Sequence, residues 1–400
     1  MKLPGIALDD KQWLQPRDVF SGSFDLRHSG YKIAPVDANL YPAGWHQICD
    51  SSRPLAIRRL QAYADMHGWA GRSAVLLAES FTRNAAYLEN IYILRELLAA
   101  VFPRVEVAMH LDALPMAGHG FQTTRGVVQV HRFALGPNGA PLVQGQELSD
   151  SVVVLATDLS GGDSFLDRLS VPLSHPRGLG WDRRTKDTFF ELYNPLAAGW
   201  AQSQGEDPWS VTVETGIVEI ASLEDETSLR ALGQAIDAMT ERIAEQYRAR
   251  GVSDVPFVAI KSVAGTFGRG VLMLTSAQEL RDLPLKVRRN LAAASPQAKP
   301  GRPLRMLVQE GIYTRDLVRG CPSEPVLYAL GGALVGGFYR SHCGKDPATN
   351  LNSPGMVFAA MCAADNVAEG QPSELSELQG MYYAVGALAL DALAAEVAAA

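Results

Sequence analysis

Residues 257–274, FVAIKSVAGTFGRGVLML, constrain the fold of this chain more than any other segment. They predict a strand that ends near Lys261, a glycine-rich turn over residues 265–270 and a second strand that leaves the turn. This hairpin differs from the strand–turn–helix units of the common phosphate-binding motifs. Glycines nevertheless let the backbone approach an anion with several N–H groups, and Lys261 adds a cation. The segment alone fits a phosphate-binding loop and a plain β-hairpin with a surface lysine equally well.

Two segments further along the chain favour nucleotide binding. Residues 305–314 predict a strand with a polar end, which can offer backbone groups to an adenine and a carboxylate to a ribose. Residues 324–342 predict two strands joined at Gly331-Gly332, so that Arg340 lies at the end of the second strand. We therefore predict a nucleotide site that includes Lys261, Gly265, Thr266, Phe267, Gly268, Gly270, Gln309, Glu310 and Ile312.

The N-terminal half has the pattern of a parallel sheet. An apolar run, AVLLAE, precedes the amphipathic segment AAYLENIYILRELLAAVF and a second apolar run, VEVAMH. A strand, a helix and a strand in this order predict a right-handed crossover between parallel strands. A further strand at 151–156 leads into the polar and glycine-rich residues 157–162. Because α/β sheets place ligands at such strand ends, Asp158 and Ser160 are candidate substrate-binding residues.

The C-terminal half predicts an α+β arrangement. A long helix over 224–250 precedes short strands at 257–262, 271–275, 305–309, 326–330 and 333–339, with a helix over 277–291 and a proline-rich loop over 292–303. The predicted fold class is therefore α/β, with α+β character in the C-terminal half. We divide the chain into an N-terminal α/β substrate domain (1–165), a connecting region with the long helix (166–252), a small subdomain with a glycine-rich lid (253–320) and a C-terminal subdomain (321–400).

The composition excludes several classes of protein. The chain has 36 Lys and Arg against 43 Asp and Glu, a net charge of −7, which gives it no general affinity for nucleic acid or an anionic membrane. No uninterrupted apolar stretch reaches the ~18 residues of a membrane span, and 384–400 predicts a packed C-terminal helix. The cysteines at 49, 321, 343 and 362 lack metal-site spacing, so we expect free thiols and a soluble protein of the reducing cytoplasm. Homo-oligomerisation is left open.

Three polar segments could bind an amino-acid substrate. Arginine or lysine can bind its carboxylates, and aspartate its ammonium. Residues 25–45 predict a loop rich in charge, residues 82–84 lie at a predicted helix N-terminus, and Arg183, Arg184 and Lys186 form a basic cluster. Each segment also fits a solvated or salt-bridged surface. The candidate substrate-binding residues are Asp25, Arg27, Lys32, Asp37, Asn39, Thr82, Arg83, Asn84, Asp158, Ser160 and Arg184.

The order of these motifs resembles that of the ATP-grasp ligases. The lysine and glycine loop precede Val308-Gln309-Glu310, then residues 336–340 (GGFYR), then Asn350-Leu351-Asn352. More narrowly, residues 25–45, 81–88, 157–162 and 180–193 are similar to motifs of the glutamate–cysteine ligase family first known from acidophilic and other proteobacteria. The resemblance implies an N-terminal parallel-sheet substrate domain followed by an ATP-grasp module.

The resemblance also implies an activity. A ligase of this family uses ATP and Mg²⁺ to activate the γ-carboxyl of glutamate as an acyl phosphate and joins it to the amine of cysteine. The product is γ-glutamylcysteine. In this chain Lys261 would contact the α- and β-phosphates, residues 265–270 would cover the phosphates, and Arg340 would stabilise the γ-phosphate, which makes Lys261 and Arg340 the catalytic candidates.

The sequence departs from the family pattern in two respects. ATP-grasp ligases usually carry acidic residues and a Glu-x-Asn pair as metal ligands; here Asn350 and Asn352 occupy the pair, and Glu310 and Glu324 are alternative ligands. Residues 80–81 and 45–47 also differ from the family motifs, so a ligase for a different acid or amine stays open. A non-catalytic nucleotide-binding regulator is a third interpretation, although such a protein would be expected to lose Arg340 and the polar N-terminal motifs.

Overall fold

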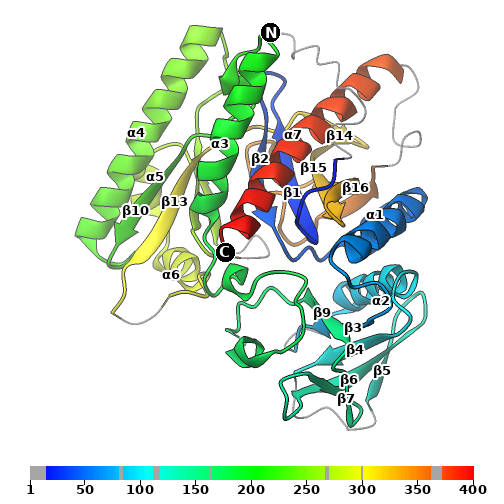
Figure 1. Ribbon diagram of the computed structural model, residues 1–400. Helices are drawn as coiled ribbons and strands as arrows, with labels where there is room; N and C mark the ends of the chain where they lie inside the picture. Colours follow the sequence, from blue (N-terminus) through cyan, green and yellow to red (C-terminus); the bar gives the residue numbers. More distant parts are fainter. Residues whose placement is uncertain are drawn as a thin grey trace.

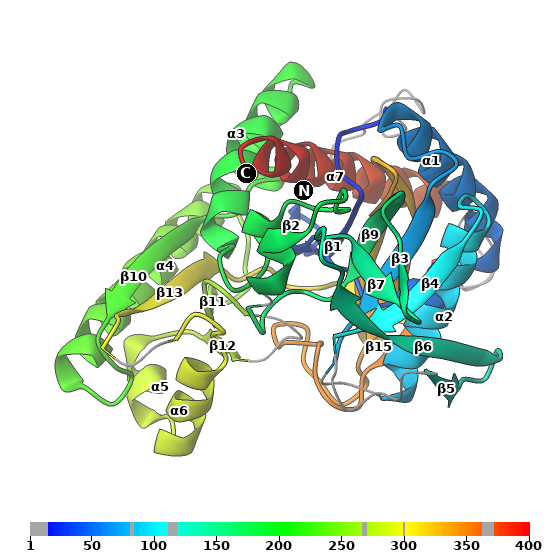
Figure 2. The same ribbon diagram turned by 60° about the horizontal axis from the view of Figure 1, so that its bottom comes forward.

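The computed structural model describes residues 15–80, 84–110, 118–162, 164–265, 270–298, 301–361 and 372–400. Within these residues the strands form three sheets with helices over their faces (Figure 1). Figure 2 shows the four-stranded sheet, with α5 (Ala277–Asp282) and α6 (Leu285–Ala293), on one side of the molecule and the seven-stranded sheet on the other. The six-stranded sheet lies between them. The predicted α/β class is confirmed.

The six-stranded middle sheet is antiparallel and joins strands from both ends of the chain. Its order is β17-β16-β15-β1-β2, with β14 beside β15. The strands are β1 (Ser21–His28), β2 (Ile33–Asn39), β14 (Asp316–Val318), β15 (Cys321–Leu330), β16 (Ala333–Ser341) and β17 (Val357–Ala360). Because β1 pairs with β15, the first strand of the chain shares a sheet with C-terminal strands. The division of the chain at residue 165 stays a prediction.

The prediction that residues 25–45 form a loop is wrong. Most of this segment forms β1 and β2, and Pro35 lies within β2. Proline is tolerated there because β2 is an edge strand, where a missing N–H need not interrupt the hydrogen bonds between strands. The charged residues that suggested a loop therefore belong to a sheet.

The seven-stranded sheet contains the predicted parallel strands. β3 (Ser73–Ala78) runs parallel to β4 (Val105–Met109) and to β9 (Ser151–Ala156), and α2 (Ala85–Ala99) connects the first two. Their apolar side chains are buried on both faces, which explains the continuous apolar runs. The other strands are β5 (His119–Gln122), β6 (Val127–Leu135), β7 (Pro141–Val143) and β8 (Gln146–Glu147), and α1 (Arg53–Met66) packs against α2.

The four-stranded sheet carries the glycine-rich segment. Its antiparallel order is β10-β13-β11-β12, formed by β10 (Thr215–Ile220), β11 (Val258–Ser262), β12 (Val271–Leu274) and β13 (Leu304–Glu310). The hairpin of β11 and β12 and the strand β13 confirm the sequence prediction, whereas β10 was not predicted. β10 completes the sheet by pairing with β13 along its whole length.

Helix α4 (Glu226–Arg250) packs on this sheet and confirms the predicted long helix. The Asp225 side chain caps its N-terminus, and Gly251 ends it in a left-handed conformation. The predicted single helix over 277–291 is wrong, because Leu283 and Pro284 separate α5 from α6. Proline cannot donate the backbone hydrogen bond that would continue the first helix.

Two long helices cover the middle sheet. α3 (Lys186–Ser203) packs against α7 (Pro372–Ala398), and α7 packs on β1, β2, β15 and β16. Leu390 and Leu393 of α7 are completely buried, which confirms a packed C-terminal helix. Among the described residues, one stretch, Leu378–Ala398, is long and apolar enough to cross a membrane by length and composition alone, and 61% of its most apolar window is buried inside the protein. Short 3-10 turns lie at Trp45–Gln47, Asp50–Ser52, Ser164–Arg168, Arg177–Leu179 and Pro208–Ser210.

Cys321 and Cys343 form a disulfide that joins the ends of β15 and β16, with 4.5 Å between their Cα atoms. No cysteine in the described part of the chain is free, so the prediction of free thiols is wrong there. Two cysteines 22 residues apart do not form a recognisable sequence motif, so the sequence did not predict this bond. The hairpin itself brings the two side chains together.

The turn between β15 and β16 occurs at Gly331 and Gly332, as predicted, and both have positive φ angles. A Cβ atom on Gly332 would lie 2.1 Å from the backbone oxygen of Arg17. We expect Gly332→Ala to lower the free energy of unfolding by more than about 2 kcal/mol, because it adds backbone strain and a clash with main chain. Denaturant titration measures the effect. Gly178→Ala is the control, since no atom lies within 4 Å of its Cβ position; equal stabilities of the two variants would contradict the described turn.

Candidate active site

The middle and four-stranded sheets share a cavity with an empty volume of about 690 Å³. Its walls come from β1, β2, β15 and β16 on one side and from β11, β12 and β13 on the other. Lys186, the first residue of α3, also lines it. The predicted site residues that line this cavity are Asp25, Arg27, Asp37, Lys261, Gly265, Gln309, Glu310, Ile312, Glu324, Arg340, Asn350 and Asn352.

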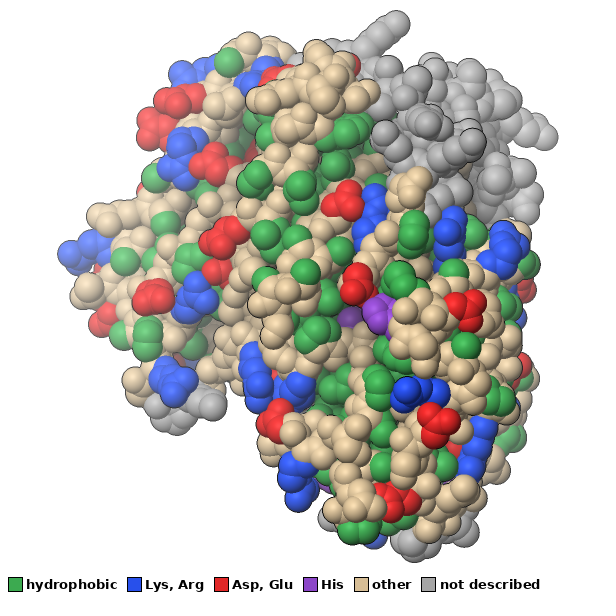
Figure 3. All heavy atoms as spheres, in the orientation of Figure 1, with side chains coloured by type: hydrophobic (Ala, Val, Ile, Leu, Met, Phe, Trp, Pro, Cys, Tyr) green, Lys and Arg blue, Asp and Glu red, His purple; other side chains and the backbone are tan. Residues whose placement is uncertain are grey.

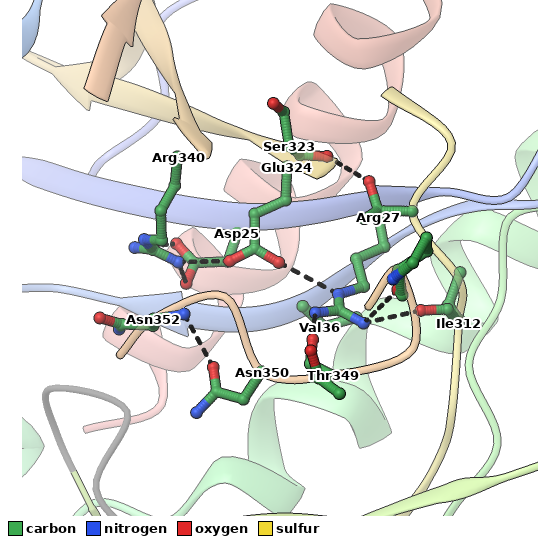
Figure 4. Close-up of polar contacts among 12 residues, drawn as sticks. Asp25, Arg27, Val36, Ile312, Ser323, Glu324, Arg340, Thr349, Asn350 and Asn352 are labelled. Carbon is green, nitrogen blue, oxygen red and sulfur yellow. Dashed lines mark hydrogen bonds and ion pairs between the residues drawn. The ribbon is translucent and has the colours of Figure 1, made fainter. Parts of the chain in front are cut away.

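Four charged side chains of alternating sign lie in this cavity wall (Figure 4). Arg340 Nη1 donates hydrogen bonds to Asp25 Oδ2 and to Glu324 Oε1, both at 2.7 Å. The second oxygen of Glu324 accepts a hydrogen bond from Arg27 Nε at 3.1 Å. The Glu324 carboxylate therefore bridges two guanidinium groups. On the face drawn in Figure 3, by contrast, acidic and basic side chains are scattered over the surface.

Burial and pairing shift the protonation of this cluster. Burial raises the pKa of Asp25, and Arg340 only partly opposes that rise. Burial alone would lower the pKa of Arg340, but Asp25 and Glu324 outweigh it and hold that pKa above its ordinary value. The guanidinium of Arg340 therefore stays charged in the interior.

The register of the middle sheet creates the cluster. Asp25 and Arg27 are two residues apart on β1, so their side chains point to the same face. Glu324 and Arg340 are opposite each other on β15 and β16, and β15 is the neighbour of β1. Arg27 also donates from Nη2 to the backbone oxygen of Thr349 at 2.5 Å. This contact ties the segment that carries Asn350 and Asn352 to β1.

A second group of charges surrounds Asp37. Lys186 Nζ donates to Asp37 Oδ1 at 2.5 Å, and the Trp181 ring lies 4.6 Å from the same ammonium. Lys261 Nζ donates to the backbone oxygen of Val36 at 2.7 Å. Burial would raise the pKa of Asp37, but Lys186 and Lys261 outweigh it and lower that pKa. Two ammonium groups therefore face one carboxylate, which leaves positive charge for a further anion.

Burial lowers the pKa of Lys261 to about 8, and Asp37 only partly opposes this shift. The cavity wall beside Lys261 is apolar at Phe257, Ala259 and Met273 and polar at Gln309. Gln309 Oε1 and Arg340 Nε are buried and have no hydrogen-bond partner among the described residues. Buried polar atoms are rarely left unpaired, so their place in a cavity wall indicates a polar ligand.

The chain matches the family described as glutamate–cysteine ligase over residues 8–397. The chain belongs to the glutamate–cysteine ligase family. It is therefore a ligase of the kind that forms a C–N bond, in a family of glutathione biosynthesis.

A solved structure supports the same relationship. A provisionally assigned gamma-glutamylcysteine synthetase from Methylobacillus flagellatus KT aligns with a TM-score of 0.84 and 27% identity, over 96% of this chain and 91% of that chain. D-cycloserine synthetase DcsG (TM-score 0.39, 12% identity, 82% of each chain) and the glutathione synthetase-like effector GSS30 from Globodera pallida (TM-score 0.39, 10% identity, 86% of this chain and 76% of that chain) are too dissimilar to support an argument. No curated protein matches the chain significantly.

Two residues predicted to bind substrate in this ligase instead hold the fold together. Lys32 Nζ lies 2.5 Å from Glu310 Oε1 and 4.4 Å from the centre of the Trp209 ring, and it is almost completely buried. Arg184 donates two hydrogen bonds to the Glu396 carboxylate, at 2.7 and 2.9 Å. Neither side chain lines the cavity. Partners far away in the sequence take up the charge of both residues, and a substrate-binding role for either one stays a prediction.

The other predicted residues lie in three kinds of place. Asn39 accepts a hydrogen bond from the backbone of Tyr41, and Gly270 lies against Leu291 and Ala294, so neither is a lining residue of the cavity. Asn84 caps α2, while Asp158 and Ser160 follow β9 at the edge of the parallel sheet. Thr82, Arg83, Thr266, Phe267 and Gly268 lie outside the described residues.

The predicted metal ligands do not all fit that role. Glu310 does not: one carboxylate oxygen contacts Lys32, and the other accepts the Glu214 backbone N–H at 3.0 Å. Within the described residues no group of three His, Cys, Asp or Glu side chains could hold a metal ion by itself. Glu324 lines the cavity, but both of its oxygens are occupied by Arg27 and Arg340. Asn350 and Asn352 also line the cavity, together with Asp25. These oxygen donors suit a cation that is held mainly by a substrate's phosphates.

Lys186 lines the cavity in place of the predicted Arg184. The sequence signal was present, since Lys186 lies in the same basic cluster and begins the amphipathic helix α3. Its backbone N–H donates to the oxygen of Val263 at 2.8 Å, which places the start of α3 next to the strand that carries Lys261. Arg184 and Lys186 differ only in their position relative to the start of α3, which begins at Lys186.

The pairing of Arg184 with Glu396 generates a stability prediction. We expect Glu396→Gln to lower the free energy of unfolding by about 3 kcal/mol, because it leaves the buried Arg184 charge without its partner. Thermal unfolding measures the stability of the variant, and steady-state kinetics measures its KM for substrate. Glu214→Gln is the control, since Glu214 pairs with Arg242 at the surface and should leave the midpoint nearly unchanged. A raised substrate KM with unchanged stability in Glu396→Gln would restore Arg184 to the substrate site.

Proposed function

We propose that this ligase uses ATP to join the γ-carboxyl of glutamate to the amine of cysteine in the described cavity. The observation that carries the proposal is the convergence of four cations, Arg27, Lys186, Lys261 and Arg340, on one cavity between two sheets. A carboxylate resists attack by an amine because its charge repels the nucleophile and oxide is a poor leaving group. Phosphorylation removes both obstacles, and the enzyme's main task is then to position and neutralise the transferring phosphoryl group.

The residues of the cavity have distinct roles in this proposal. Lys261 and Lys186 attract the phosphates, since they hold more positive charge than Asp37 neutralises. Arg340 is held in place by Asp25 and Glu324 and stabilises negative charge on the transferring group. The γ-carboxylate of glutamate attacks the γ-phosphorus of ATP, ADP leaves, and the amine of cysteine then displaces phosphate.

The cavity fits a nucleotide and Mg²⁺ in its residue types. Phe257 and Met273 give an apolar surface suited to an adenine. Gln309 Oε1, which has no partner within the described part of the chain, is a hydrogen-bond acceptor beside them. Asp25 and the two asparagines would hold Mg²⁺, which neutralises phosphate charge when bound. We also propose a cytoplasmic location, where ATP is supplied; the Cys321–Cys343 disulfide is unusual for that compartment.

Isotope transfer tests the reaction. With ATP, Mg²⁺, cysteine and glutamate labelled with ¹⁸O in its γ-carboxyl, we expect ADP and one labelled phosphate per γ-glutamylcysteine, because the displaced oxygen comes from glutamate. Mass spectrometry of the phosphate measures the label. AMP and pyrophosphate as products would contradict the acyl phosphate. Tight ATP binding without turnover of any amino-acid pair would contradict the ligase reaction. Turnover that needs glutamate but not cysteine would contradict only the assignment of cysteine as the acceptor.

Substitution of Lys261 tests its proposed contact with the phosphates. Lys261→Ala should abolish turnover, whereas Lys286→Ala, a change at an exposed lysine, should not.

The pKa of Lys261 generates a pH prediction. Its ammonium is charged below pH about 8 and neutral above it. We therefore expect ATP affinity to fall as pH rises through about 8, approaching a tenfold loss per pH unit as the charged fraction declines. Calorimetric titration with ATP at several pH values measures this. Lys261→Arg is the matched control, because arginine stays charged over the whole range and should abolish the dependence. A wild-type affinity that is constant between pH 7 and 9.5 would show that Lys261 does not contact the phosphates.

A further inference from the structure

Two buried aromatic rings lie against the ammonium groups that line the cavity. The centre of the Trp181 ring is 4.6 Å from Lys186 Nζ, and the centre of the Phe190 ring is 5.9 Å from Lys261 Nζ. Both rings are 1% exposed, and neither lines the cavity itself. The face of an aromatic ring carries partial negative charge, so it attracts a cation at these distances. Each of the two lysines thus has an aromatic ring within reach.

The start of α3 brings both rings to this place. Trp181 lies in the segment before the helix, where its backbone N–H donates to the oxygen of Asp158 at 3.0 Å. Phe190 lies on α3 itself, one helical turn after Lys186. One short segment, residues 181–190, therefore supplies a ring to its own lysine and a second ring to Lys261 of β11.

A ring attracts an ammonium group without neutralising it. A further carboxylate would cancel one positive charge of the cavity, whereas an aromatic ring has no net charge. Among the described residues of this region, the cations Arg184, Lys186 and Lys261 lie near two carboxylates, Glu396 and Asp37. The rings therefore stabilise buried positive charge and leave one charge in excess for a phosphate.

Trp209 provides a comparison within the same protein. Its ring centre lies 4.4 Å from Lys32 Nζ and also 4.4 Å from the guanidinium carbon of Arg250. Each of these cations has a carboxylate of its own, Glu310 for Lys32 and Asp207 for Arg250. Neither cation lines the cavity. The rings beside the cavity differ from Trp209 in that the cations near them outnumber the carboxylates.

Hydrogen bonding of the indole does not explain why tryptophan occupies position 181. Trp181 Nε1 is buried and has no hydrogen-bond partner among the described residues, whereas a buried tryptophan usually finds one. The ring, by contrast, has a cation on both Lys186 and Arg184, the latter at 4.7 Å. Tryptophan is the side chain whose face attracts cations most strongly. Attraction of cations therefore accounts for this residue better than its N–H does.

We propose that Trp181 and Phe190 are positioning residues, which hold the ammonium groups of Lys186 and Lys261 charged and in place for the phosphates of ATP; this assignment rests on the proposed function. Both rings act through the lysines, because neither ring lines the cavity. Trp181 keeps the Lys186 ammonium next to the cavity. Phe190 favours the charged form of Lys261, which burial opposes.

Substitution of Trp181 tests its effect on Lys186. Calorimetry of the full-length chain with Mg²⁺ and a non-hydrolysable ATP analogue measures the affinity. We expect Trp181→Leu to weaken binding by about 10- to 30-fold, up to the strength of a buried contact between a cation and a ring, because the lysine is then free to leave its place. Trp181→Phe keeps an aromatic face and should restore most of the affinity. Equal losses in the two variants would overturn the role of Trp181.

Fluorinated tryptophans at position 181 test the same contact if Trp181→Leu does not fold. Fluorine keeps the shape of the ring but withdraws electrons from its face, so the attraction for a cation weakens. The affinity for the ATP analogue should then fall with each added fluorine. An affinity that does not respond to fluorination would overturn the role of Trp181.

The pH dependence of ATP binding tests Phe190. Burial lowers the pKa of Lys261 to about 8, and the charged groups that act on this lysine are Asp37, Lys186, Asp25 and Arg27. Phe190→Leu should lower this pKa further, so that ATP affinity falls at a lower pH than in the wild type but equals the wild-type affinity near about pH 6. Phe189→Leu is the matched control. Phe189 is equally buried on the same helix and stacks on Tyr193, so this variant should keep the wild-type profile.

The pH profile separates the proposed role from a structural one. A structural defect in Phe190→Leu would weaken ATP binding equally at every pH, and that result or an unchanged profile would overturn the role of Phe190 even if the wild-type enzyme turns over glutamate and cysteine. ATP binding that depends on both rings, in a protein that forms no γ-glutamylcysteine, would support the assignment and contradict the proposed function. Absence of ATP binding to wild-type protein would overturn both.

Discussion

Arg340 lies between two carboxylates, Asp25 and Glu324, and the candidate active site depends on this interaction. The desolvation of buried ion pairs often offsets their attraction, so such a pair contributes little net stability compared with apolar side chains of the same size. The cluster is therefore better explained by the chemistry of the site than by the stability of the fold. Charges fixed before the substrates bind need not reorganise as negative charge develops during reaction.

This arrangement requires β1 to lie in the middle of a sheet made mainly of C-terminal strands. β1 brings Asp25 and Arg27 beside a hairpin more than 290 residues away in the sequence. A shift of one residue in the pairing would turn both side chains to the opposite face. The buried contact between Lys32 and Glu310 then fastens the β1–β2 turn to β13 of the four-stranded sheet. The N-terminal hairpin thus sets the position of one sheet relative to the other.

Local patterns were sufficient to predict part of the structure. The apolar runs of β3 and β4, the long helix α4 and the glycine turn at Gly331-Gly332 all depend on residues close in sequence, and each was predicted. Convergence of Lys261, Gln309 and Arg340 on one cavity was also expected, because the order of their motifs resembled a known family. The local elements were predicted without any knowledge of long-range strand pairing. The shared cavity was predicted only through the resemblance to the family.

The failures share a physical cause. Whether Lys32, Arg184 or Lys186 reaches the cavity depends on which carboxylate lies nearby, and these partners are Glu310, Glu396 and Asp37. All three carboxylates are more than 140 residues away from their partners, so charge and local spacing could not distinguish the three residues. The disulfide was missed for the same reason, since hairpin geometry and not spacing brings Cys321 to Cys343.

The excess of positive charge in the cavity follows from what the proposed reaction requires. A site that neutralises transferring phosphate needs more positive than negative charge, and the pair of Lys186 and Lys261 around Asp37 provides it. Asp37 is nevertheless needed, because two ammonium groups close together in a buried site repel each other, and a carboxylate beside them opposes that repulsion. Held in this way before the substrates bind, the two ammonium groups can attract the phosphates without rearranging.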